Sequence, residues 1–154
     1  MRKLVRYGSE VALGPAPTID EIEELEREGF RSMICLDVEG EERQALTPNV
    51  EATWAHTFEM RHERLSVDQH FLDSKLVQRF RALLAAVEKP VYVHSRDGRR
   101  AAALMTIEFG RARGLTGAQA LEQAAQLGFS CDDERLRAFV LREVDRRRPS
   151  ASAR

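Results

Sequence analysis

The sequence predicts a single three-layer α/β domain, in which a mostly parallel sheet of about four or five strands carries helices on both faces. Two observations predict this class. Apolar segments rich in β-branched residues alternate along the chain with segments of helical periodicity. The apolar segments are almost continuous, as in strands buried on both faces. Because right-handed crossovers place helices on both faces of such a sheet, we expect residues 1–147 to form one domain.

Strands and helices alternate in the predicted order. The predicted strands cover residues 10–14, 30–38, 60–68 and 91–94, and the predicted helices cover residues 18–29, 72–87, 99–114, 116–128 and 132–144. Two helices begin at capping boxes, Thr18 with Glu21 and Thr116 with Gln119. Residues 39–57 receive no assignment, because Pro48 breaks any long helix there. Residues 148–154 are expected to be a disordered basic tail.

The composition gives no sign of a strongly charged partner. The chain has 24 Lys and Arg against 25 Asp and Glu, for a net charge of -1. We therefore expect neither nucleic acid nor a membrane surface as partner. Cys35 and Cys131 share no metal-binding spacing with the histidines, so we interpret them as reduced thiols. Since the first residues lack the apolar core of a signal peptide, we expect a cytoplasmic protein.

One stretch, VYVHSRDGRRAAAL (residues 91–104), has the layout of an anion-binding site. It leads from an apolar strand through a polar turn into a helix, and ligands of open α/β sheets bind beyond the carboxyl ends of the strands. Backbone N–H groups of the turn and the positive end of the helix attract an anion, and Gly98 lets the backbone curl. Arg100 can grip two oxygens of phosphate or sulfate in a bidentate fork. Arg96 and Arg99 add positive potential.

This stretch resembles the phosphate-binding loop of the cysteine-dependent tyrosine and dual-specificity phosphatases, in which His-Cys, two residues, Gly, one or two residues and Arg follow a buried strand. It is most similar to a small bacterial dual-specificity-like branch that has the shorter spacing. His94, Gly98 and Arg100 match the motif. The upstream VALGPAPTIDEIEELEREGFRSMICLDVEGE and the later RLSVD are also similar to that branch, so the resemblance covers residues 11–129. It implies a phosphoric monoester hydrolase that needs no metal or cofactor and acts on a phosphorylated protein or a small phosphomonoester.

Two positions depart from the family pattern. In the longer, commoner spacing the arginine would fall at Ala101, and Ser95 occupies the place of the nucleophilic cysteine. A thiol is partly ionised at neutral pH, whereas ionising an alcohol costs roughly 10 kcal/mol. We therefore expect the Ser95 chain to bind phosphomonoesters without turning them over. Three interpretations of Ser95 are open: an engineered substitution that traps ligand, a natural loss of the nucleophile, or a structural serine in an unrelated protein.

The family chemistry also needs an acid that protonates the leaving oxygen. Asp68 is the candidate, because it ends a predicted strand and matches the aspartate of the family's V-D segment. Asp73 is the alternative, and its competing role is a cap on the next helix. Asp97 lies inside the loop, and we expect its carboxylate to turn outward and pair with an arginine. His94 is expected to hydrogen-bond the loop backbone, with its ring on the opposite strand face from Ser95.

Two other functions stay open. A non-catalytic module that binds phosphorylated ligands would have the same fold and the same loop. A rhodanese-like sulfurtransferase has a loop of similar spacing, but the acidic strand and the His-x-Pro-Gly segment expected upstream of it are absent from the sequence.

Overall fold

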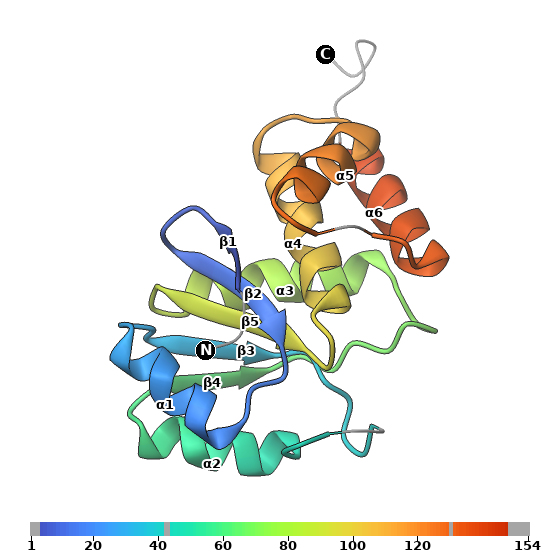
Figure 1. Cartoon of the computed structure of the whole chain (residues 1–154). Helices are drawn as coiled ribbons and strands as arrows, with labels where there is room; N and C mark the ends of the chain where they lie inside the picture. The colour runs from blue at the N-terminus through green and yellow to red at the C-terminus, as the bar shows by residue number, and fades with distance from the viewer. Residues whose placement is uncertain (1–3, 42–43, 130, 148–154) are drawn as a thin grey trace.

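The computed structural model describes residues 4–41, 44–129 and 131–147. The predicted basic tail, residues 148–154, lies outside these ranges. Within the described residues five strands form one sheet in the order β1-β2-β5-β3-β4 (Figure 1). β1 pairs antiparallel with β2, and the other three pairs are parallel. The strands are β1 Val5–Tyr7, β2 Val11–Pro15, β3 Ser32–Cys35, β4 Arg61–Arg64 and β5 Val91–Ser95. The predicted mostly parallel α/β sheet is confirmed.

Helices cover both faces of the sheet. The helices are α1 Ile19–Arg27, α2 Pro48–Thr57, α3 Ser74–Ala86, α4 Arg99–Ala112, α5 Gly117–Gln126 and α6 Glu134–Arg147. Figure 1 shows α1 and α2 on one side of the sheet and α3 with α4 on the other, while α5 and α6 pack on α4. Each face of the sheet therefore has its own apolar core.

The alternation of side chains along β5 decides which residue reaches which face. Tyr92 belongs to the core under α1 and α2, whereas Val91 and Val93 belong to the core under α3 and α4. His94 continues the Tyr92 side and stacks on its ring at 5.9 Å between centroids. Ser95 continues the other side, toward α4. The predicted placement of His94 and Ser95 on opposite strand faces is therefore confirmed.

The local signals in the sequence give mixed results. Thr18 and Thr116 open α1 and α5 through capping boxes, as predicted. Within the described part of the chain no helix runs through Pro48, in agreement with its interpretation as a helix breaker, but the helix that begins at Pro48 has no counterpart among the predicted helices. Pro48 is the first residue of α2, and Thr47 caps that helix by accepting the Val50 N–H. Proline is tolerated at this position because the N–H that it lacks has no partner inside the helix in any case.

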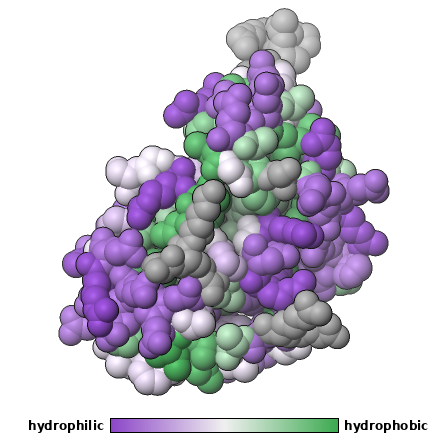
Figure 2. Space-filling view, viewed as in Figure 1, coloured by the Kyte–Doolittle hydropathy of each residue, from purple (hydrophilic) through white to green (hydrophobic). Residues whose placement is uncertain are grey.

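The surface agrees with the high charged content of the sequence, 32%. Figure 2 shows that hydrophilic side chains cover most of the viewed face and that hydrophobic residues appear there in small groups. Among the described residues, no helix has both the length and the apolar character needed to cross a membrane.

Candidate phosphate-binding site

The loop between β5 and α4 lies at the carboxyl ends of the parallel strands β2, β5 and β3, where ligands of open α/β sheets bind. Ser95 is the last residue of β5 and is fully buried. Its Oγ accepts the N–H of Ala101 in the first turn of α4 at 3.3 Å. The Gly98 N–H donates to the Ser95 carbonyl at 3.2 Å and closes the turn. The hydroxyl at the nucleophile position thus faces the N-terminus of a helix of 14 residues.

Gly98 is required by the shape of this turn. It has φ 88°, in the left-handed region, and it precedes the first residue of α4. A Cβ atom at this position would lie 3.2 Å from the carbonyl carbon of Gly14 at the end of β2. Because other residues disfavour both the φ value and the close approach, glycine lets the loop pack directly on the neighbouring strand.

The loop presents backbone donors that the described part of the chain does not use. Among the described residues, the N–H groups of Arg96, Asp97 and Arg100 have no hydrogen-bond acceptor. N–H groups gathered in one tight turn can form a concave site for an anion, and the positive end of α4 adds to their field.

A cavity of about 310 Å³ opens in front of the loop. Its walls come from the loop itself, from the segment after β3 and from the segment after β4, and its lining residues are Val38, Glu41, Val67, Asp68, Gln69, His70, Arg96 and Arg100. Of the predicted site residues, Asp68, Arg96 and Arg100 therefore meet at one cavity. Ser95 is buried behind it.

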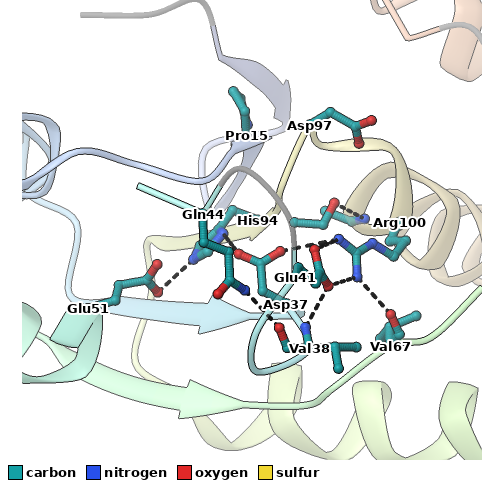
Figure 3. Close-up of polar contacts among 12 residues, drawn as sticks. Pro15, Asp37, Val38, Glu41, Gln44, Glu51, Val67, His94, Asp97 and Arg100 are labelled. Carbon is teal, nitrogen blue, oxygen red and sulfur yellow. Dashed lines mark hydrogen bonds and ion pairs between the residues drawn. The ribbon is translucent and has the colours of Figure 1, made fainter. Parts of the chain in front are cut away.

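Arg100 is held by three acceptor residues, which come from the segment after β3 and the segment after β4 (Figure 3). Its Nη1 donates to Glu41 Oε1 at 2.5 Å and to the Val67 carbonyl at 2.8 Å. Its Nη2 donates to Glu41 Oε2 at 2.8 Å and to Asp37 Oδ1 at 3.3 Å. Glu41 thus accepts hydrogen bonds from both terminal nitrogens of the guanidinium. Asp37 contacts only Nη2, on the edge that Nη2 shares with Nε. Within the described residues, Nε itself has no hydrogen-bond partner.

The two carboxylates on Arg100 differ in their surroundings. Burial alone would raise the pKa of Glu41, but hydrogen bonds from Arg100 and from the Val38 N–H, at 2.6 Å for the latter, lower it below its usual value. Burial raises the pKa of Asp37, against the opposing charge of His94. Glu41 is therefore a firmly ionised partner that fixes the guanidinium, whereas the contact with Asp37 is longer and weaker.

The role predicted for His94 needs a correction. No hydrogen bond joins its ring to the loop backbone among the described residues. Instead its Nε2 lies 2.7 Å from Glu51 Oε2, and its Nδ1 faces Asp37 Oδ2 at 3.7 Å (Figure 3). The reason is the strand alternation, which points the ring toward Glu51 of α2, on the face of β5 opposite to Ser95. His62, which sequence reasoning left without a role, reaches the same Glu51 oxygen at 2.7 Å.

A possible metal site lies beside the loop. Its four donor side chains are of the kind that bind zinc, and one ligand atom from each lies within 4.8 Å of the others: Cys35, Asp37, Glu51 and His94. The carboxylates, however, face opposite nitrogens of one imidazole ring, Glu51 at Nε2 and Asp37 at Nδ1. Glu51 also lies at hydrogen-bond distance from two rings. This arrangement suits a charged ring held between carboxylates better than ligands that converge on one ion.

The other three aspartates considered for the site have different positions and partners. Asp68 lines the cavity, and its Oδ1 accepts the His70 N–H at 2.9 Å. Asp73 caps α3 by accepting the Leu76 N–H at 2.9 Å, and it does not line this cavity. Asp97 is exposed, lies 3.5 Å from Arg99 Nε and accepts the Arg99 N–H at 3.1 Å. Asp97 therefore turns outward and pairs with an arginine, as expected from the sequence.

No protein-family model matches this chain, and no curated protein matches its sequence. A candidate phosphatase of Neisseria meningitidis Z2491 superposes with a TM-score of 0.76 at 19% identity, over 94% of this chain and 97% of that one. A candidate phosphatase of Shewanella putrefaciens CN-32 gives 0.74 at 17% identity, over 96% and 93%. TpbA of P. aeruginosa, as a Cys→Ser variant in complex with pTyr, gives 0.73 at 18%, over 92% and 87%. The chain therefore has the fold of these phosphatase structures.

Proposed function

We propose that the protein binds phosphomonoesters at the loop Ser95–Arg100 and, with serine at position 95, does not hydrolyse them at a significant rate. One observation carries the proposal. The Ser95 hydroxyl accepts an N–H from the first turn of α4, next to loop N–H groups that have no acceptor among the described residues. This geometry fits three phosphate oxygens and an attacking atom behind them. The fold shared with phosphatases supports the assignment.

Arg100 supplies the side-chain part of the site. Because Glu41 and the Val67 carbonyl hold its far end, the edge formed by Nε and Nη2 is the one that can accept a bidentate anion. An anion there would replace the 3.3 Å contact with Asp37, the longest of the four. Arg96, at the cavity wall, adds a second positive charge.

The serine lacks the means to act as a nucleophile. A serine nucleophile ordinarily needs a hydrogen-bonded base, and the neighbouring His94 lies on the other face of β5 and contacts Glu51. The Ser95 Oγ accepts a hydrogen bond from Ala101, which does nothing to remove its proton. Ionising the free alcohol costs roughly 10 kcal/mol. The proposal is tested by following, in one sample of the unchanged protein, both the binding of a phosphomonoester and the release of phosphate.

With cysteine at position 95 the same site would carry out phosphoric monoester hydrolysis. The thiolate sulfur attacks phosphorus, the bond from phosphorus to the leaving oxygen breaks, and Asp68 gives that oxygen its proton. Asp68 then takes a proton from the water that attacks the phosphocysteine, which releases phosphate and restores the thiolate. Substrates of this reaction would be phosphorylated proteins or small phosphomonoesters.

We expect Asp68→Asn, in the Ser95→Cys background, to slow hydrolysis of an alkyl phosphate far more than that of p-nitrophenyl phosphate. The reason is that a poor leaving group needs the proton in the transition state, whereas nitrophenolate leaves without it; general acid catalysis contributes about a hundredfold or more. Steady-state kinetics with both substrates measure the difference. Asp73→Asn is the matched control, because Asp73 caps α3. Equal slowing of both substrates by Asp68→Asn would remove Asp68 from the acid role.

A further inference from the structure

We propose that Glu51 is a positioning residue, which holds His94 as a positively charged imidazolium beneath the phosphate-binding loop and so adds a fixed charge to the anion site. The role of this charge in binding an anion rests on the proposed function. The charge itself follows from contacts that lie outside the cavity.

Three elements bring the charged cluster together. Glu51 comes from α2, His62 from β4 and His94 from the end of β5. Both Nε2 atoms lie 2.7 Å from the same oxygen of Glu51. The side chains of all three residues are at most 2% exposed. Water therefore cannot replace these partners, and the protein must satisfy their hydrogen bonds internally.

The contacts around His94 define its protonation. An ionised carboxylate is only an acceptor, so His94 Nε2 carries a hydrogen toward Glu51. At the other ring nitrogen, Nδ1 faces a second carboxylate oxygen, Asp37 Oδ2, at 3.7 Å and makes no hydrogen bond of standard geometry among the described residues. The Cys35 thiol also lies close to the ring, and its interaction with His94 raises the pKa of the imidazole. A neutral ring would point a lone pair at the Asp37 oxygen, whereas a protonated Nδ1 meets it with a positive hydrogen. Both edges of the ring therefore favour the imidazolium.

The electrostatics of the cluster agree with this assignment. Complete burial alone would lower the pKa of His94, but the charge of Glu51 outweighs it and raises the pKa to about 10. Burial would raise the pKa of Glu51, yet His94 and His62 lower it to about 2. The pair is consequently ionised across the neutral range. The other titratable groups that face the ring or its partners are Cys35 on β3, Asp37 after β3, Tyr92 on β5 and Arg100 on α4.

The charge of His94 lies close enough to the anion site to affect anion binding. His94 immediately precedes Ser95, and Asp37 lies between the imidazole ring and Arg100, 3.7 Å from Nδ1 and 3.3 Å from Nη2. A neutral His94 would leave the three carboxylates Asp37, Glu41 and Glu51 opposed by two arginines, Arg100 and, at Glu41, Arg96. The excess of negative charge would repel an incoming phosphate. A charged His94 offsets one of these carboxylates. It also lets Asp37 give up its contact with Arg100 while keeping a positive neighbour.

The first test measures the charge of His94 directly. In NMR spectra of the ring nitrogens of the unchanged protein, His94 is expected to stay protonated from neutral pH upward until the pH approaches about 10. In Glu51→Gln, which keeps the shape but removes the charge, His94 should be neutral at about pH 8, as an ordinary histidine is. Glu51→Asp restores the charge and should restore protonation. A ring that is neutral at pH 7 in the unchanged protein would overturn the proposal without any variant.

The second test measures the consequence for the anion site. At about pH 8 the binding of tungstate by Glu51→Gln should be about tenfold weaker than by the unchanged protein, and the difference should shrink as the pH falls and His94 becomes charged. Glu63→Gln is the control, because Glu63 on β4 pairs with the exposed Arg61. Equal tungstate affinity at pH 8 overturns the role of the charge. If the unchanged protein binds no tungstate, the proposed function itself fails, and the NMR result still decides the state of His94.

Discussion

Replacing Ser95 by cysteine is expected to turn the protein into a metal-independent phosphatase. The cysteine sulfur would occupy the place of the Ser95 Oγ, which faces the N–H of Ala101 at the N-terminus of α4. That environment stabilises a thiolate. The roughly 10 kcal/mol needed to ionise an alcohol corresponds to about seven powers of ten in rate, so the gain is the largest effect that we predict. Release of nitrophenolate from p-nitrophenyl phosphate measures it.

Three observations should accompany this activity. Vanadate or thiol alkylation should abolish it, a chelator should leave it unchanged, and Ser95→Ala should stay inert. The unchanged protein shows how far the reagent alkylates the two native cysteines, of which Cys35 is buried and Cys131 is half-buried. If the cysteine variant binds tungstate but remains inert over a broad pH range and a panel of phosphomonoesters, the proposal that cysteine at position 95 makes this site a phosphatase fails. The non-catalytic binding module then takes its place.

Replacing Arg100 by alanine is expected to weaken the binding of tungstate by about a hundredfold, because it removes charge-assisted hydrogen bonds to the anion. It also removes the cation that Glu41 and Asp37 share, which leaves more uncompensated negative charge near the cavity. Arg100→Lys should recover only part of the affinity, since an ammonium group cannot form the bidentate contact. Calorimetric titration with tungstate measures all three proteins.

The control for this series is Arg99→Ala. Arg99 is the neighbour of Arg100 in the same helical turn, but it is exposed and pairs with Asp97. Its loss should change the affinity only slightly, through the general field of the loop. Equal affinity in Arg100→Ala and in the unchanged protein would remove Arg100 from the site.

The fold could be predicted because its signals are local. The apolar strands and the capping boxes at Thr18 and Thr116 lie in continuous segments, so each is visible without knowledge of the rest. β1 was missed because it has only three residues and pairs at the sheet edge. α2 was missed because Pro48 was taken to interrupt a helix that it begins. With α2 unassigned, Glu51 could not be placed.

The site could be predicted only where one segment builds it. The loop from Ser95 to Arg100 and its helix form a continuous stretch, and their layout alone indicates an anion site. The carboxylates that surround Arg100 and His94 come from other segments, and the parallel pairing of β3 with β5 brings them together. No spacing in the sequence connects Asp37 or Glu51 with His94. A charged residue near the carboxyl end of an apolar strand, as Asp37 is in the predicted strand 30–38, was the one available signal.

The central claim, that the chain as it stands binds phosphomonoesters and leaves them intact, is tested most directly by phosphorus NMR of the unchanged protein mixed with phosphotyrosine. We predict saturable binding at one site, displaced by tungstate and strongly weakened in Arg100→Ala, with the ester signal undiminished after prolonged incubation. A growing signal of inorganic phosphate would show that Ser95 is activated by a base, and the absence of binding would show that the loop is no phosphate site. Either result would contradict the account.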